Sequence, residues 1–218
     1  MPNIAKAYVR IAIFDADGVV TSPKRFADDL ARDFGTKPED LTPFFQGPFQ
    51  DALIGKVDLK TIIQPYLKDW NWAGTVDEFL AYWFKAEDEI NEQVLSIVTD
   101  LRERGIKCYL ATNQEKYRLE YMRKKMGFER IFNGVFSSSD LGCKKPDKQF
   151  FERLLKRLDP RRKVPTKEIL FWDDTEANIE AAKKFGIQAY LFTDNESFVK
   201  TMLDVPITSP RFLRPRKK

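Results

Sequence analysis

The pattern of apolar and polar residues divides the chain into an α/β part and an all-helical part. An apolar run over residues 9–14, interrupted only by Arg10, predicts a buried strand. From residue 91 onward, short apolar runs alternate with amphipathic stretches, several of which end in glycine. The further strands are expected at residues 106–111, 134–137, 169–172 and 187–192. Strands that alternate with helices imply right-handed crossovers, so we predict a Rossmann-like parallel sheet sandwiched by helices.

Residues 21–86 interrupt this alternation and contain no strand of any length. Apolar residues repeat at helical spacing over residues 26–34 and are followed by glycine, which predicts a helix. Thr75 and Glu78 have the spacing of a capping box and precede an aromatic-rich stretch, which predicts another. This segment therefore indicates a small, aromatic-rich helical unit inserted after the first strand.

These boundaries predict two domains and a tail. Residues 1–20 and 87–205 form the α/β core domain, and residues 21–86 form the helical cap domain. Residues 206–218 are rich in arginine and lysine, and we expect them to be a disordered, solvated tail. The net charge of +4 comes from 37 basic and 33 acidic residues without a basic stripe along the body, so no nucleic-acid partner is expected.

The composition excludes several kinds of catalysis. The 218 residues include no histidine, which rules out Ser-His and Cys-His mechanisms and the usual zinc sites. Cys108 and Cys143 have no metal-binding spacing. No signal peptide or long apolar span is visible, so we expect a cytoplasmic protein without a membrane partner. The available chemistry is that of carboxylates, lysine, hydroxyl groups and a hard metal ion.

Polar residues follow the predicted strands at the point where each one ends. Asp15 and Asp17 follow the first strand, and on this segment alone an ordinary polar turn is as good an interpretation as a catalytic pair. The residues that follow later strands are Thr112, Asn113, Lys145, Asp173 and Asp174. In a parallel sheet these ends share one edge, so the side chains can converge. Carboxylates, a hydroxyl and an ammonium group suit a phosphate with Mg²⁺.

Four motifs occur in order at these strand ends. They are Asp15-Ala16-Asp17-Gly18, Ala111-Thr112-Asn113, Lys145-Pro146-Asp147, and Asp173-Asp174 with Asn178 following. Together they resemble the motifs of haloacid dehalogenase superfamily hydrolases, in the branch with a helical cap. The chain is similar to the phosphatase domain of soluble epoxide hydrolases and to sugar-phosphate phosphatases. The family's last motif commonly begins Gly-Asp, whereas Trp172-Asp173 stands here, so either neighbouring aspartate remains a candidate for the direct metal ligand.

The resemblance implies a phosphatase that hydrolyses a small phosphomonoester, such as a sugar phosphate, through an aspartyl-phosphate. Asp15 would attack phosphorus. Asp17 would protonate the leaving oxygen and later activate water. The residues implied to bind phosphate are Thr112, Asn113 and Lys145, with Thr112 and Lys145 also counted as catalytic. The implied partner is a small phosphorylated metabolite, and nothing in the pattern specifies an oligomeric state.

The resemblance also implies Mg²⁺ as cofactor. Asp15, the backbone carbonyl of Asp17 and Asp174 would bind it, with Asp173 as an outer or alternate ligand. The cap would cover the site and set specificity. The cap residues that could face the substrate are Lys24, Arg25, Phe45, Gln46, Tyr82 and Trp83. Packing of the cap's own core is the simpler interpretation of the aromatic ones, so Lys24 and Arg25 are the favoured candidates for contacting the substrate.

Other functions remain open at this stage. A phosphomutase or another phosphotransferase of the family would use the same core residues with a cap that rebinds the intermediate. The family's dehalogenases lack the second aspartate, which is present here as Asp17, so the resemblance favours a phosphatase over a dehalogenase. A non-catalytic phosphate-binding protein on this fold would not need both aspartates.

Overall fold

The computed structural model describes residues 8–23, 25–161 and 163–207. They contain a five-stranded, all-parallel sheet with the strand order β3-β2-β1-β4-β5. The strands are β1 (Ile11–Phe14), β2 (Lys107–Thr112), β3 (Val135–Ser137), β4 (Ile169–Asp173) and β5 (Gln188–Leu191). The predicted α/β class with a parallel sheet is confirmed. Lys24 and nearly all of the predicted tail lie outside the described residues.

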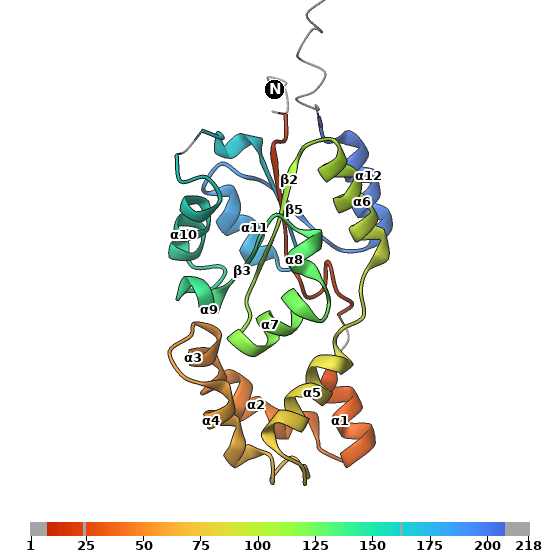
Figure 1. Ribbon diagram of the computed structural model, residues 1–218, viewed down its shortest axis with the longest axis vertical. Coiled ribbons are helices and arrows are strands. Elements are labelled where there is room, and N and C mark those ends of the chain that lie inside the picture. The colour runs from red at the N-terminus through yellow and green to blue at the C-terminus, as the bar shows by residue number, and fades with distance from the viewer. Residues whose placement is uncertain (1–7, 24, 162, 208–218) are drawn as a thin grey trace, which may run out of the picture.

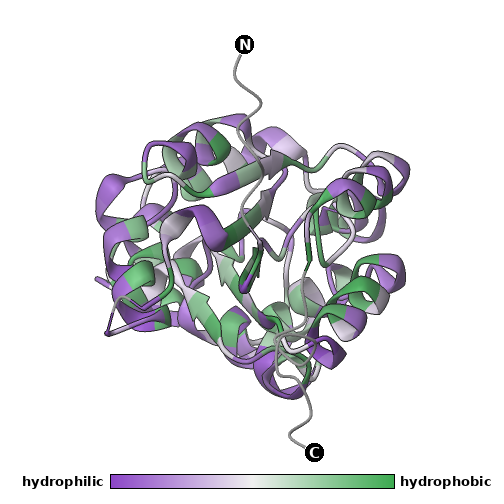
Figure 2. Ribbon diagram, turned by 90° about the horizontal axis from the view of Figure 1, so that it is seen from above, coloured by the Kyte–Doolittle hydropathy of each residue, from purple (hydrophilic) through white to green (hydrophobic). Residues whose placement is uncertain are grey.

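Helices cover both faces of the sheet (Figure 1). One face packs against α6 (Glu92–Glu103), α7 (Lys116–Lys124), α8 (Phe128–Ile131) and α12 (Asn195–Asp204). The other packs against α9 (Ser138–Leu141), α10 (Lys148–Leu158) and α11 (Glu176–Lys183), and the short 3₁₀ turn η2 (Thr166–Glu168) precedes β4. Seen from above, hydrophobic residues gather where these helices face the sheet (Figure 2). None of the described helices has the length and hydropathy needed to cross a bilayer.

The central strand β1 is buried on both faces because helices lie on either side of it. Ala12 and Phe14 belong to one hydrophobic cluster, and Ile11 and Ile13 to the other. Such strands read as continuous apolar runs rather than alternating ones. Phe14 pairs with both neighbouring strands in the last register position of β1. The next residue, Asp15, therefore emerges at the carboxyl edge in the middle of the sheet.

A separate hydrophobic cluster organises the helices that follow β1. These are α1 (Phe26–Phe34), α2 (Pro38–Gln46), α3 (Phe49–Leu53), α4 (Leu59–Ile63), the 3₁₀ turn η1 (Gln64–Tyr66) and α5 (Val76–Ala86). They lie beyond the carboxyl ends of the strands (Figure 1). The predicted capping box is present at α5, where Thr75 and Glu78 bind each other's backbone N–H groups. We refer to these helices as the cap.

Two chain segments connect the cap to the sheet and pair with each other. Ser22 donates its N–H to the carbonyl of Glu89 at 2.8 Å, and Asn91 donates to that of Val20 at 2.9 Å. Arg118 on α7 is buried and donates to the carbonyls of Phe84 in α5 and of Glu87 just after it. These contacts hold the cap against the carboxyl edge of the sheet.

Candidate active site

The site is assembled where β1, β2 and β4 end side by side. The backbone N–H of Asp15 donates to the carbonyl of Trp172 at 2.8 Å, which extends the β1–β4 pairing to the first aspartate. Thr112 ends β2 on the other side of β1 and is buried. Asp173 ends β4. The sequence therefore delivers these three side chains to adjacent positions because the strands are parallel and in register.

Lys145 lies at the centre of a buried charge cluster. Its Nζ is 2.8 Å from Oδ2 of Asp15 and 2.6 Å from Oδ2 of Asp173. The three residues are 2%, 8% and 0% exposed, in the order Lys145, Asp15, Asp173. Asn113 holds the lysine's backbone: its amide donates to the Lys145 carbonyl at 3.0 Å and its oxygen accepts from the Lys145 N–H at 2.8 Å. The loop between α9 and α10 thereby brings the ammonium to the aspartates.

Asp173 and Asp174 differ sharply in their surroundings. The Oδ1 atom of Asp173 accepts from the Thr175 N–H at 2.9 Å and from the Asn178 amide at 2.8 Å, while its Oδ2 atom meets Lys145. Asp174 is exposed, and the hydroxyl of Thr175 donates to its Oδ1 at 3.2 Å. Both oxygens of Asp173 are therefore occupied by protein donors, whereas Asp174 remains accessible.

Asp174 can lie close to the backbone of the Asp17-Gly18 loop because residue 18 is glycine. Gly18 has a φ of +75°, and a Cβ atom there would lie 2.1 Å from Oδ2 of Asp174. A side chain at position 18 would therefore be strained in its backbone and would displace the carboxylate.

The acidic groups of this cluster fit a divalent cation. Asp15, Asp173 and Asp174 each offer a carboxylate oxygen, and these oxygens lie within 4.8 Å of one another. Lys145 supplies one positive charge against the three carboxylates, which leaves two negative charges in excess. Oxygen ligands and this charge suit Mg²⁺.

Burial has the largest effect on the pKa of Asp15. Burial raises the pKa of Asp15 to about 8, with the charges of Asp173 and Asp17 acting in the same direction and the Lys145 ammonium opposing them. Partial desolvation of the Asp174 carboxyl group, together with the charge of Asp173 beside it, also raises the pKa of Asp174. A nearby cation favours the ionised form of a carboxyl group, so a bound metal would return Asp15 to the carboxylate that a nucleophile requires.

Two residues that the sequence analysis did not single out hold Asp17. The hydroxyl of Thr21 donates to its Oδ1 at 3.1 Å, and the side-chain amide of Gln114 donates to its Oδ2. The signal for Gln114 was its position directly after the Thr112-Asn113 pair. Asp17 is thus fixed by donors on both oxygens, next to but outside the Lys145 cluster.

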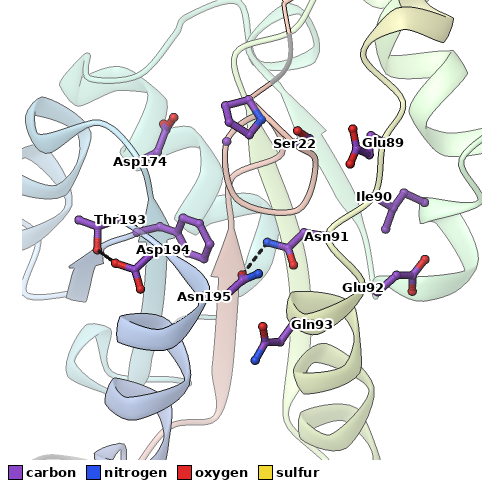
Figure 3. Close-up of a pocket in the computed structure, with 13 residues that line it drawn as sticks. Ser22, Glu89, Ile90, Asn91, Glu92, Gln93, Asp174, Thr193, Asp194 and Asn195 are labelled. Carbon is purple, nitrogen blue, oxygen red and sulfur yellow. Dashed lines mark hydrogen bonds between the residues drawn. The ribbon is translucent and has the colours of Figure 1, made fainter.

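Two cavities flank the loop that carries Asp17 and Gly18. One, of about 440 Å³, lies between the cap and the core and is lined by Asp17, Asn113 and Arg25, among others. Arg25 thus lies near the site, although no contact joins it to Asp15 or Lys145. The other, of about 710 Å³, lies on the side of Gly18 and Asp174 (Figure 3).

Comparisons with known proteins agree with this geometry. A family model described as a haloacid dehalogenase-like hydrolase matches residues 9–186. Sesquiterpene phosphatase astK from Aspergillus oryzae is 29% identical over 103 residues, which are 47% of this chain and 50% of that protein. Phosphatase MT3486 from Mycobacterium tuberculosis is 23% identical over 84% of this chain and 87% of its own. Bifunctional epoxide hydrolase 2 from Mus musculus is 24% identical over 89% of this chain, which spans only 38% of the mouse protein.

A solved structure shares the fold. The HAD family enzyme bt-2542 from Bacteroides thetaiotaomicron superposes with a TM-score of 0.75 at 18% identity, covering 90% of this chain and 99% of that one. The family model spans β1, the cap and the strand ends that carry all four motifs, which confirms the resemblance inferred from them. The chain is therefore an enzyme that belongs to the haloacid dehalogenase-like hydrolases.

Proposed function

We propose that the protein is a Mg²⁺-dependent phosphatase that hydrolyses a small phosphomonoester through an aspartyl-phosphate intermediate. The observation that carries the proposal is the buried cluster in which Lys145 lies between Asp15 and Asp173, beside the accessible carboxylate of Asp174. The printed names of the Aspergillus and Mycobacterium relatives identify those proteins as phosphatases. A structure of the Bacteroides enzyme, 18% identical, is a complex with magnesium and inorganic phosphate.

In the first step, a carboxylate oxygen of Asp15 attacks phosphorus. The bond between phosphorus and the leaving oxygen breaks, and Asp17 gives that oxygen its proton, so the alcohol departs. The Lys145 ammonium offsets negative charge on Asp15 and on the phosphoryl oxygens. Thr21 and Gln114 hold the carboxyl group of Asp17 in place outside the lysine cluster.

In the second step, Asp17 accepts a proton from water as the water oxygen attacks the phosphorus of the aspartyl-phosphate. The bond between phosphorus and the Asp15 oxygen breaks, which releases inorganic phosphate and restores the carboxylate. The hydroxyl of Thr112 and the N–H of Asn113 are assigned to the phosphoryl oxygens.

Asp15, the backbone carbonyl of Asp17 and the Asp174 carboxylate are the groups that would hold Mg²⁺. When bound, the ion supplies positive charge that reduces repulsion between the carboxylate and the phosphate. We assign Asp173 to positioning Lys145, because both of its oxygens are already engaged by donors from the protein.

The direct test is turnover of p-nitrophenyl phosphate with and without Mg²⁺. Asp15→Asn should lower kcat by roughly 10³-fold or more, since it removes the nucleophile. Asp100→Asn is a matched control, because Asp100 is an exposed aspartate paired with Arg104 on α6, and it should keep native turnover. Equal rates for the native protein and Asp15→Asn would refute the mechanism.

A further inference from the structure

Apolar side chains of the cap form about half of the lining of the cavity between the cap and the core. Asp17 and Asn113 lie at its core end, so it is continuous with the proposed phosphate site. Its volume of about 440 Å³ falls within the range typical of small-ligand pockets. The apolar side chains that matter most are those of Phe26, Leu41, Phe45, Phe49, Leu53 and Trp83.

The aromatic rings at this cavity form one connected group. The ring centroids of Phe26 and Trp83 are 4.8 Å apart, those of Phe45 and Phe49 4.9 Å, and those of Phe45 and Trp83 5.4 Å. Phe45 is only partly buried, whereas its neighbours belong to the buried cluster of the cap. The ring of Phe45 therefore keeps some accessible surface at the cavity, and its position is fixed by the rings around it.

The polar groups on the same wall are already engaged. Glu87 accepts from the N–H of Phe26 at 3.1 Å and from the indole of Trp83 at 2.9 Å. Gln114 donates its amide to Asp17. A sugar needs hydrogen-bond partners for its hydroxyl groups, and leaving them unpaired in a cavity is costly.

The polar side chains that remain along this cavity are exposed. They are Arg25, Thr42 and Gln46. A polar rim around an apolar interior suits a molecule whose organic part is apolar and whose charge lies at one end.

The cavity on the other side of the Asp17-Gly18 loop does not suit the substrate. Glu89, Glu92, Asp174 and Asp194 line it, and the described residues of its lining include no lysine or arginine (Figure 3). Carboxylates repel a phosphomonoester, which is itself an anion. The substrate's organic group therefore belongs in the cavity under the cap, against its apolar side chains.

We propose, resting on the phosphatase function above, that the substrate is the monophosphate of an apolar alcohol. Its phosphate lies at Asp15 and its hydrocarbon group lies against Phe45 and Trp83. Binding energy from a part of the substrate remote from the reacting bond raises kcat/KM when it is realised in the transition state. Chain length should thus control the rate of hydrolysis.

The experiment measures kcat/KM for n-alkyl phosphates from ethyl to octyl and for glucose 6-phosphate. Each methylene that enters the cavity is expected to raise kcat/KM by about four-fold until the cavity is full. Octyl phosphate should exceed glucose 6-phosphate by at least ~100-fold. A kcat/KM that does not rise with chain length, or a higher value for glucose 6-phosphate, would overturn the proposal.

Phe45→Gln tests whether the hydrocarbon group of the substrate lies against Phe45. The ratio of kcat/KM between octyl and ethyl phosphate should fall by about ten-fold, because the apolar face of the ring is lost. Phe34→Gln is the matched control: Phe34 belongs to the cap cluster but packs against Trp72 and Tyr82, and the ratio should stay native. An unchanged ratio in Phe45→Gln contradicts the assignment.

If Phe45→Gln does not fold, Thr42→Asp puts a charge at the exposed edge of the same cavity. It should lower the ratio as well, and an unchanged ratio would overturn the proposal. The outcomes also separate the two proposals. Absence of Asp15-dependent hydrolysis of p-nitrophenyl phosphate would refute the phosphatase function. Asp15-dependent hydrolysis without any preference for longer alkyl chains would refute the apolar substrate alone.

Discussion

Replacing Asp173 by asparagine tests how the buried charges are divided between lysine and metal. The Oδ1 atom of Asp173 accepts from Thr175 and Asn178, so an asparagine oxygen would keep that place. The new amide NH₂ would then face the Lys145 ammonium, which lies 2.6 Å from Oδ2 in the native protein. Two donors would meet inside a fully buried site, and Lys145 would keep only Asp15 as its anionic partner.

The expected cost is large because Lys145 and Asp173 have no exposed side-chain surface. Breaking a buried ion pair by removing one partner costs about 3–5 kcal/mol of the free energy of unfolding. For a chain of this size, that lowers Tm by roughly 6–20 °C. Removing the Asp173 charge also relieves its repulsion with Asp15, which offsets part of the loss. The lost attraction to Lys145 exceeds the relieved repulsion with Asp15, because the Lys145 ammonium is in direct contact with Asp173.

Asp174→Asn is the matched control, since Asp174 is exposed and has the Thr175 hydroxyl as its side-chain donor. It should change the free energy of unfolding by less than about 1 kcal/mol. It should, however, raise the Mg²⁺ concentration needed for half-maximal turnover, whereas Asp173→Asn should lower kcat by roughly 10–100-fold with less effect on that concentration. Thermal unfolding and Mg²⁺ titration of both variants distinguish them. The reverse pattern, with Asp174→Asn unstable and Asp173→Asn defective in Mg²⁺ activation, would refute the assignment.

Three further predictions concern the cap, the glycine and the metal. Arg118→Met should lower the free energy of unfolding by about 3 kcal/mol in denaturant titration, because the buried carbonyl of Phe84 and the partly buried carbonyl of Glu87 lose their donor; a loss below 1 kcal/mol would contradict this. Gly18→Ala should weaken Mg²⁺ activation, since its Cβ would overlap the Asp174 carboxylate, and a native Mg²⁺ titration would count against that reasoning. Chelation with EDTA should abolish phosphatase turnover and added Mg²⁺ should restore it, whereas full activity in excess EDTA would argue against a metal.

Much of the fold could be predicted because apolar runs and helix-ending glycines mark the elements directly. The exact start of a helix is harder to predict: α7 begins at Lys116, because the carboxylate of Glu115 accepts the N–H groups of Tyr117 and Arg118. The last helix, α12, was not predicted. Its buried residues are Phe198 and Met202, too few to produce a clear pattern, although Asp194 caps it.

The residues of the candidate site could be predicted from the sequence, but the separate roles of Asp173 and Asp174 could not. Asp173 and Asp174 are neighbours in sequence, and only the three-dimensional positions of Lys145 and Gly18 distinguish their surroundings. The cavity between the cap and the core could not be predicted for a similar reason. Which cap aromatics pack inward and which line a space such as the one beside Phe45 depends on how the cap sits over the sheet.

The central claim is that Asp15 carries the phosphoryl group, and mass spectrometry of the Asp17→Asn variant tests it most directly. With p-nitrophenyl phosphate the leaving group departs without protonation, so Asp15 can still be phosphorylated, whereas the water step lacks its base. The phosphoenzyme should therefore accumulate, with one added phosphoryl group on the peptide that contains Asp15. A phosphoryl group on any other residue, or release of p-nitrophenol without modification of Asp15, would contradict the account.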